Sequence, residues 1–455
     1  MNRELRYDVV VIGAGSAGLV AGIRLAQAGA SVCVIAKGYG STHLAPGTID
    51  VLGYAPGRVD SPQLGRVDSP GAVLSEFAAT RPDHPYALLG AGLVAEAIDW
   101  FAAAAARGPF PGYGYSGSLD RNVLLPTAAG ALKPSALIPE TFAAGDSRQL
   151  GRVVIVGTEE LRDFHPKLCA ANLRAAGIDA RALSVDIECD RADSSTLAFA
   201  RRLDDRAGRA AFAGRLAPLV RAADQVGLPA MLGLHDPHAV LTDLEARLGR
   251  RVFEIPSLPP SVPGMRLYEI LRDALRRAGG RLVLGAGVIG HRNAGARIAS
   301  IATDTAGSHT TYAADAFVFA AGGFHSGALA LDSRWRARDQ VLGLPLHGAP
   351  PPGEPRFLAS YFDEQPLARA GVAVDGDLRS TGAGNVVVAG ASLPGAVPWR
   401  EGSGEGIALA SGYRAAQVIA ADLGAAGLGA RKADPSPAAP PTPAKPAGVG
   451  AENLT

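Results

Sequence analysis

A glycine-rich turn that directly follows an apolar segment constrains this chain more than any other feature of its sequence. Tyr7 to Ile12 is an apolar run typical of a β-strand, and it leads into Gly13-Ala14-Gly15-Ser16-Ala17-Gly18. Residues 19–36 then favour a helix, a turn at Gly29 and a second apolar strand. A strand-turn-helix-strand unit with glycines at this spacing is typical of the phosphate-binding start of a doubly wound α/β sheet.

The glycines of this turn have separate roles. Gly13 allows the tight turn, Gly15 lets a phosphate or pyrophosphate approach the backbone, and Gly18 lets the helix pack closely on the sheet. Amide groups at the start of the helix then face the anion. We therefore predict that Gly13, Ala14, Gly15, Ser16, Ala17 and Gly18 bind the phosphate part of a nucleotide cofactor, the alternative being a turn that binds nothing.

The end of the second strand bears on which nucleotide binds. Dinucleotide sites usually carry an acidic residue there, which hydrogen-bonds a ribose. This strand ends in Val34-Ile35-Ala36-Lys37, so Ala36 stands in the place of the acid. A cation at Lys37 tolerates a phosphate, although a lysine after a strand is equally typical of a solvated surface. The pattern leaves a mononucleotide open as the cofactor.

Composition excludes several classes of function. The 455 residues, 47% of them hydrophobic, are enough for two or three domains with substantial cores. A net charge of +1 gives no reason to expect nucleic acid or an anionic membrane as a partner. Cys33, Cys169 and Cys189 are too far apart to hold an iron–sulfur cluster or zinc, so we expect no metal. No apolar run reaches the length of a membrane span, and reduced thiols suit the cytoplasm.

The segment Gly38 to Tyr54 is polar and turn-rich, and it leaves the second strand at the edge of the sheet where ligands bind. Ser41, Thr42 and Thr48 are candidate donors to a cofactor ring or phosphate. His43 is a candidate for direct contact with the ring. A histidine in a loop is more often a structural hydrogen-bonding residue, so its role stays open.

A second α/β unit follows in the middle of the chain. Val153 to Val156 and Ala180 to Val185 are typical of short buried strands, and Leu161 to Ala176 favours a helix between them. We predict an inserted α/β domain at 151–265, between the halves 1–150 and 266–424 of a split nucleotide-binding domain.

A proline-rich connection leaves the inserted domain. Residues 256–263 contain four prolines and indicate either a wall that places Arg266 over a site or a plain linker. A helix over Leu267 to Ala278 and a strand over Arg281 to Leu284 are expected next. The last segment, 425–455, is rich in Ala and Pro without periodicity and is expected to be disordered.

Two more glycine-rich segments follow predicted strands near the end of the chain. Ala316 to Ala320 leads into a turn that contains Gly322, and Asn385 to Ala389 leads into Gly390-Ala391-Ser392. A glycine-rich helix start then includes Gly404 and Gly406, ahead of a helix over Ile407 to Leu423. Backbone amides there can point at an electron-rich ring edge. We predict that Gly322, Gly390, Gly404 and Gly406 line the cofactor.

Together these elements resemble the flavoproteins with two dinucleotide-binding domains, in the branch of the fumarate reductase flavoproteins. The closer resemblance, over residues 6–423, is to the B subunits of anaerobic glycerol-3-phosphate dehydrogenase. The segments that carry it are Ser41 to Leu52, Pro126 to Pro139, Leu258 to Leu267, the run Ala-Gly-Gly-Phe-His-Ser-Gly at 321–327 and the C-terminal glycine helix. The implied fold is a Rossmann-like FAD/NAD(P)-binding flavoprotein fold with an inserted α/β domain.

The resemblance implies a complex that oxidises sn-glycerol 3-phosphate to dihydroxyacetone phosphate and passes electrons to quinone. A chain of this family is then expected to hold noncovalent FMN, with FAD as the alternative. Its partners would be an FAD-containing catalytic subunit and an iron–sulfur membrane-anchoring subunit. The chain would be cytoplasmic, or peripheral on the inner face of the membrane through that partner. Gly390-Ala391-Ser392 lacks the acidic residue that many related flavoproteins have there for the ribityl chain.

His43, His325 and Arg400 are the side chains we expect nearest the ring, although a structural role suits each of them because a relay flavin needs no general acid or base. Two other functions stay open. One is a self-sufficient dehydrogenase or reductase of the fumarate-reductase-like family, and the other is a non-catalytic assembly protein that has lost the cofactor.

Overall fold

The structure is a computed structural model, which describes residues 3–55, 65–187, 194–305, 308–351, 353–360, 363 and 365–425. Cys189 and the predicted disordered tail lie outside the described residues, except that Ala425 is the last residue of a helix. Within the described ranges, no helix is long and apolar enough to cross a membrane.

The larger sheet is mixed, and its central strand is β1 (Arg3–Ile12). β1 pairs in parallel with β2 (Val32–Ala36) and β14 (Ser308–Phe319). β11 (Arg281–Leu284) continues the parallel part beside β2, and β19 (Val386–Val388) pairs in parallel with the end of β14. The carboxyl ends of these strands meet at one edge, which is where ligands bind in such sheets.

An antiparallel hairpin extends this sheet beyond β14, and the sequence did not predict it. β12 (Gly287–Ala294) pairs with β13 (Arg297–Thr305), which pairs with the first half of β14. β12 is largely exposed, so it lacks the apolar alternation by which a half-buried strand is found in sequence.

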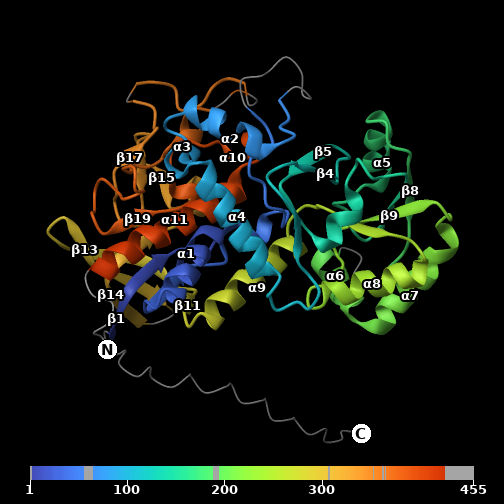
Figure 1. Ribbon diagram of the computed structural model, residues 1–455, viewed down its shortest axis with the longest axis horizontal. Coiled ribbons are helices and arrows are strands. Elements are labelled where there is room, and N and C mark those ends of the chain that lie inside the picture. The colour runs from blue at the N-terminus through green and yellow to red at the C-terminus, as the bar shows by residue number, and fades with distance from the viewer. Residues whose placement is uncertain are drawn as a thin grey trace, which may run out of the picture.

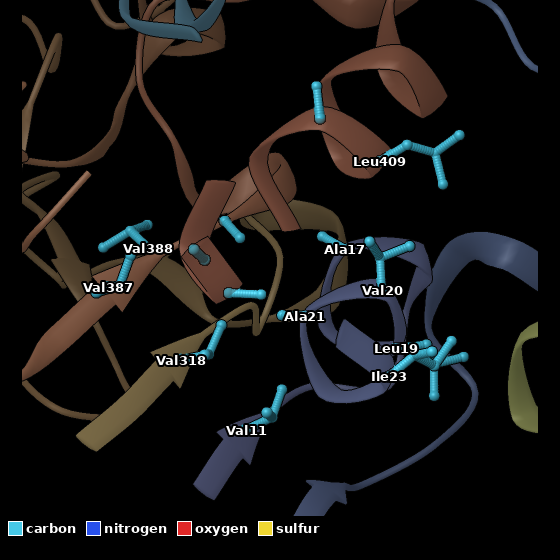
Figure 2. Close-up of a cluster of buried hydrophobic side chains, with 14 of the residues drawn as sticks. Val11, Ala17, Leu19, Val20, Ala21, Ile23, Val318, Val387, Val388 and Leu409 are labelled. Carbon is cyan, nitrogen blue, oxygen red and sulfur yellow. The ribbon is translucent and has the colours of Figure 1, made fainter. Parts of the chain in front are cut away.

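Three helices pack against the larger sheet: α1 (Ser16–Gln27), α9 (Val262–Arg277) and α11 (Gly404–Ala425). A fourth, α4 (Ala91–Ala105), packs on α9 and α11 (Figure 1). α1 packs against both α9 and α11. In Figure 2 the apolar side chains of α1 lie between strand residues such as Val11 and Val318 and Leu409 of α11. Leu19, Val20 and Ile23 are fully buried there, which fixes the start of α1 over the edge of the sheet.

The second, four-stranded sheet has the order β10-β9-β7-β8 and is entirely parallel. Its strands are β7 (Arg152–Gly157), β8 (Ala180–Ser184), β9 (Asp224–Pro229) and β10 (Val252–Ile255). Its helices are α5 (Pro166–Ala175), α6 (Thr196–Asp204), α7 (Arg206–Leu216) and α8 (Pro237–Leu248). It has its own apolar core and lies on the right of Figure 1, apart from the larger sheet. The α/β fold is confirmed, and the bounds 1–150, 151–265 and 266–424 stay predictions.

Two predicted helices have different starting points. The helix expected from Leu161 begins only at Pro166, because residues 158–165 form turns and a proline is best tolerated in the first helical turn. The helix expected from Leu267 begins earlier, at Val262, since the Ser261 side chain accepts the Gly264 N–H and caps it.

Arg266 lies in α9 and is fully buried. Its guanidinium donates to Glu254 of β10 at 2.7 Å and 3.1 Å and to the Gly233 carbonyl at 2.8 Å and 2.5 Å. The expectation that the proline segment places Arg266 over a site is therefore wrong. This arginine instead joins α9 to the smaller sheet.

The remaining elements surround these two sheets. They are α2 (Pro70–Ala79), α3 (Pro85–Leu89), α10 (Pro398–Glu401), β3 (Tyr115–Gly117), β4 (Val123–Pro126), β5 (Leu132–Ser135), β6 (Leu137–Pro139), β15 (Leu329–Leu331), β16 (Ala337–Asp339), β17 (Leu346–His347) and β18 (Gly371–Val372), with short 3-10 turns that include η1 (Gly40–Leu44) and η6 (Gly390–Ser392).

Candidate functional site

Three glycine-containing turns meet at the carboxyl edge of the larger sheet. The Gly13 N–H donates to the Ile35 carbonyl, and the Ala320 N–H donates to the Ile12 carbonyl. Gly13 has a φ of +114°, and a side chain at this position would place its Cβ 2.1 Å from the Ala320 carbonyl oxygen. The turns after β1 and β14 therefore touch, and only glycine fits between them.

The cradle itself has the geometry of a phosphate site. Gly15 is the N-cap of α1, and no atom lies within 4 Å of the place where its Cβ would stand. At Gly18 a Cβ would lie 2.0 Å from the Gly13 carbonyl oxygen. Open space over Gly15 and close packing at Gly18 are what an anion at this helix start requires. Ala14, Ser16 and Ala17 are buried around it, so the residues present fit a nucleotide phosphate.

The loop after β2 faces the same helix start. Thr42 is buried on η1, and its Oγ1 lies 3.5 Å from the Ser16 Oγ. Ser41 and Lys37 are exposed, with Lys37 directly beyond the end of β2. A Cβ at Gly40 would lie 3.3 Å from the Gly15 Cα. Thr42 is therefore the member of this predicted group that is packed against the cradle.

Gly322 and Gly390 lie in the turns on the other side of the carboxyl edge of the larger sheet. Gly322 and Gly390 have φ values of +85° and +69°. The Ser392 hydroxyl accepts the Gly322 N–H and donates to the Gly322 carbonyl, which ties the turn after β14 to η6. At Gly390 a Cβ would lie 2.8 Å from the Ala17 Cβ. Gly390 thus lets η6 pack closely on α1, whereas Gly322 leaves room for the Ser326 side chain in its own turn.

The start of α11 lies beside this edge as well. Gly404, its first residue, is exposed, whereas the Gly406 N–H donates to the Asp50 carbonyl at 2.9 Å. A Cβ at Gly406 would meet the Tyr86 hydroxyl at 2.4 Å, so Gly406 allows packing and its amide is already used. Between them Glu405 has a buried Oε2 without a hydrogen-bond partner.

A charged network that the sequence did not predict lies next to Glu405. The Lys133 ammonium donates to Asp50 at 2.5 Å and to the Thr48 and Ser135 hydroxyls at 2.9 Å each. Both hydroxyls in turn donate to Asp50. Thr48 is one of the predicted donors, but Asp50 and Lys133 are separated by 83 residues. Their only signal in the sequence is a charge inside each of two apolar segments.

His43 lies in an aromatic cluster and not among the glycine turns. Its ring stacks on Tyr39 at 4.5 Å and meets Tyr268 of α9 edge-on at 4.9 Å. The Nε2 of His43 and the hydroxyl of Tyr268 are buried without partners. Burial lowers the pKa of His43, so the ring is neutral at pH 7.

His325 contacts the chain neighbour of Arg400 and has a different aromatic partner from His43. The exposed His325 ring is 5.8 Å from the ring of Trp399, the neighbour of Arg400 on α10. His43 and His325 thus have different aromatic neighbours, and the contact of His43, His325 and Arg400 with the ring stays a prediction.

A buried hydrogen-bond network around Glu401 holds the segment between α10 and α11. Glu401 accepts hydrogen bonds from His84 at 3.1 Å, from the Ser403 hydroxyl and from the Val397 N–H. The Nδ1 of His84 accepts the Tyr86 N–H, so this histidine is neutral. Burial raises the pKa of Glu401, but these donors outweigh it and hold the pKa below its ordinary value.

Within the part of the chain that the structure describes, no group of three or more His, Cys, Asp or Glu side chains could hold a metal ion. Cys33 and Cys169 are buried and unpaired. Burial raises the pKa of each thiol to about 12, which makes both unreactive.

The meeting strand ends, the open cradle and the second glycine-rich helix start define a nucleotide-binding α/β protein. The sequence matches the family described as FAD binding domain over residues 8–391. The cofactor is therefore a flavin.

Comparison with similar proteins identifies the family within this class of nucleotide-binding proteins. A probable B subunit of anaerobic glycerol-3-phosphate dehydrogenase from Halobacterium salinarum is 33% identical over 444 residues, which cover 91% of this chain and 98% of that protein. The B subunit of anaerobic glycerol-3-phosphate dehydrogenase from Pectobacterium carotovorum is 31% identical over 434 residues, covering 91% and 99%. This chain belongs to the family of anaerobic glycerol-3-phosphate dehydrogenase B subunits, as the sequence predicted.

Solved structures also align with this chain. The 3-ketosteroid delta1-dehydrogenase of Sterolibacterium denitrificans is 14% identical, with a TM-score of 0.43, and the alignment covers 92% of this chain and 100% of that one.

Proposed function

We propose that this chain is the flavin-carrying electron-transfer component of a complex that oxidises sn-glycerol 3-phosphate to dihydroxyacetone phosphate and passes the electrons to quinone. The observation that supports this most directly is an open phosphate cradle at Gly15 in a chain that matches B subunits over nearly its whole length. A flavin, when bound, supplies a two-electron acceptor that can release electrons singly or in pairs.

The flavin is proposed to be FAD, with FMN as the alternative. A family match that runs from residue 8 to 391 and is described as FAD binding supports FAD. Ala36 at the end of β2 supports FMN, because no carboxylate follows to hold an adenosine ribose. Mass measurement of the released cofactor decides between them. Acid precipitation should release it, whereas a coloured pellet would indicate a covalent bond, with His43 the first residue to test.

The chain's own residues would bind and orient that group. The amides of Gly15 and Ser16 would face the phosphate, with the Thr42 hydroxyl beside it. Gly322 and Gly390 would keep the neighbouring turns close enough to exclude water. The free end of α11 at Gly404 would point its amides at the ring edge.

The complex is proposed to contain two further subunits, one with FAD and the substrate site and one with iron–sulfur clusters that anchors the assembly to the membrane. The absence of a metal-ligand cluster among the described side chains supports a separate cluster-bearing chain. The chain would then lie in the cytoplasm, on the inner face of the membrane.

Dye reduction tests this assignment. The chain alone should reduce an electron-accepting dye poorly or not at all with glycerol 3-phosphate, and addition of the two partners should restore activity. Full activity of the isolated chain would contradict the relay function.

A self-sufficient dehydrogenase is the second candidate, and the Lys133–Asp50 network beside the glycine turns favours it because charged groups at that place also suit a substrate. His43, His325 and Arg400 are then the first side chains to replace. Bleaching of the flavin by substrate in the isolated chain would support this function. A folded chain without any flavin would instead indicate an assembly protein.

A further inference from the structure

We propose that Glu405 accepts hydrogen bonds from the hydroxyl groups of the ribityl chain, which joins the flavin ring to its phosphate. The inference rests on the proposed function, because it requires a flavin at the cradle, and it assigns to Glu405 a role in recognising that flavin. Glu405 is the second residue of α11 and follows the exposed Gly404.

The Glu405 carboxyl group lies beside the cradle, next to the Ser16 hydroxyl, and one of its two oxygens lacks a donor. Its Oε2 is buried without a hydrogen-bond partner. Burial raises the pKa of Glu405 to about 7, while the Ser16 hydroxyl and Lys133 act to lower it and Asp50 acts to raise it. Ser16 is the first residue of α1, so the carboxyl group stands beside the helix start that receives the phosphate. A buried acceptor without a donor is costly unless a ligand supplies one.

Neighbouring groups already have partners within the chain. All three protons of the Lys133 ammonium are used by Asp50, Thr48 and Ser135. The Ser392 hydroxyl is bonded to Gly322. The Ser411 hydroxyl accepts the Gly390 N–H and donates to the Ile407 carbonyl. These groups are therefore engaged elsewhere, and a ligand hydroxyl would supply the donor that the Glu405 Oε2 lacks.

The groups around Glu405 indicate which kind of hydrogen-bond donor a ligand would supply. A phosphate at Gly15 and Ser16 is an anion, which a neighbouring carboxylate repels. The atoms covalently attached to that phosphate in a flavin belong to a polyol, and each of its hydroxyl groups can donate to a carboxylate oxygen. The ring N–H is also a donor, but it lies at the far end of the molecule from the phosphate. Adjacency to Ser16 therefore favours the polyol.

Three flavin compounds test the assignment on the full chain. Lumiflavin has the ring but no ribityl chain, riboflavin adds the chain, and FMN adds the phosphate. Their dissociation constants are measured by flavin fluorescence for the wild type, Glu405→Gln, Glu405→Ala and the control Glu245→Gln. Glu245 lies on α8, a helix that accompanies the smaller sheet. Its carboxylate accepts hydrogen bonds from the Arg251 side chain and the Val252 N–H.

We expect Glu405→Ala to weaken riboflavin and FMN about 10- to 100-fold, the range typical of a hydrogen bond to a charged group, and to change lumiflavin less than about twofold. Glu405→Gln, which keeps the shape and an acceptor oxygen, should show the same selectivity with a smaller loss, and Glu245→Gln should show none. Circular dichroism checks that each variant is folded.

Two results would overturn the inference while leaving the proposed function intact. One is binding of all three compounds by the wild type with an unchanged riboflavin-to-lumiflavin ratio in both Glu405 variants. The other is displacement of riboflavin by glycerol 3-phosphate, which is also a polyol phosphate and would then be the ligand of this carboxylate. A wild type that binds neither these three compounds nor FAD would refute the proposed function and the inference with it.

Discussion

Replacement of Arg266 by methionine should destabilise the chain strongly without changing how it binds a cofactor. The side chains of Arg266 and Glu254 are both completely buried. The variant leaves the Glu254 carboxylate buried with the Leu232 N–H as a remaining donor at 2.6 Å. The Gly233 carbonyl also loses both guanidinium donors.

Removal of one member of a buried ion pair costs about 3–5 kcal/mol, because the other charge is left without compensation. That is a large part of the stability of a typical domain, about 5–15 kcal/mol. Although burial acts to lower the pKa of Arg266, the charge of Glu254 raises it above its ordinary value, so the arginine remains charged at every accessible pH. We therefore expect Arg266→Met to lower the free energy of unfolding by about 3–5 kcal/mol at neutral pH.

Urea unfolding, followed by tryptophan fluorescence, measures this loss through the midpoint and slope of the transition. The double variant Arg266→Met/Glu254→Met is the matched control, and it should recover most of the stability because no unpaired charge remains. A loss below about 1 kcal/mol in the single variant, or a loss of flavin binding at unchanged stability, would refute the structural role of Arg266.

Three further predictions concern the site. Gly15→Val should remove the bound flavin, and its melting temperature should nearly equal that of the flavin-free wild type, since the new side chain enters open space. Gly18→Ala should instead lower the free energy of unfolding by about 1–3 kcal/mol through contact with the Gly13 carbonyl. The ratio of flavin absorbance to protein and thermal melting measure both effects. In the folded state burial raises the pKa of Glu405 from 4.5 to about 7, because the ionised form is disfavoured there. Without flavin, the free energy of unfolding of the wild type should therefore fall by up to about 3 kcal/mol as the pH rises from about 4.5 through 7. Glu405→Gln should lack this slope in melting experiments across that range. Lys133→Met should lower the free energy of unfolding, measured in urea, by about 1–3 kcal/mol, because Asp50 then lacks a neighbouring cation.

Each of these predictions has an outcome that contradicts it. Full flavin content in Gly15→Val would place the phosphate elsewhere. Equal pH slopes in the wild type and Glu405→Gln would mean that Glu405 does not titrate near neutrality. Unchanged stability in Lys133→Met would show that solvent compensates Asp50.

Sequence reasoning succeeded where the physical cause is local. The first strand, the glycine turn and the helix after it follow from apolar periodicity and from the backbone freedom of glycine, both of which act over a few residues. β11 has the predicted bounds, Arg281–Leu284. The hairpin of β12 and β13 was missed because its first strand is mostly exposed and is held by backbone pairing to β13 and β14.

Sequence reasoning also left the side chains of the site incomplete. His43, His325 and Arg400 were selected by residue type and by their neighbours in the chain. In the structure His43 stacks on Tyr39 and His325 contacts Trp399, so their contact with a ring stays a prediction. Asp50 and Lys133 were overlooked because a charge within an apolar segment does not identify its partner 83 residues away.

The sequence by itself determined the phosphate cradle and the class of fold, since glycine spacing and apolar runs specify a strand, a turn and a helix without reference to distant residues. Only the tertiary structure decided which charges are compensated. Arg266 compensates Glu254 and Lys133 compensates Asp50, each brought near by folding, and Glu401 accepts hydrogen bonds from His84 and Ser403. The Oε2 of Glu405, in contrast, is left without a partner. The reason is that the cost of a buried charge depends on all the groups around it in space, and their positions are fixed only when the two sheets and their helices pack together.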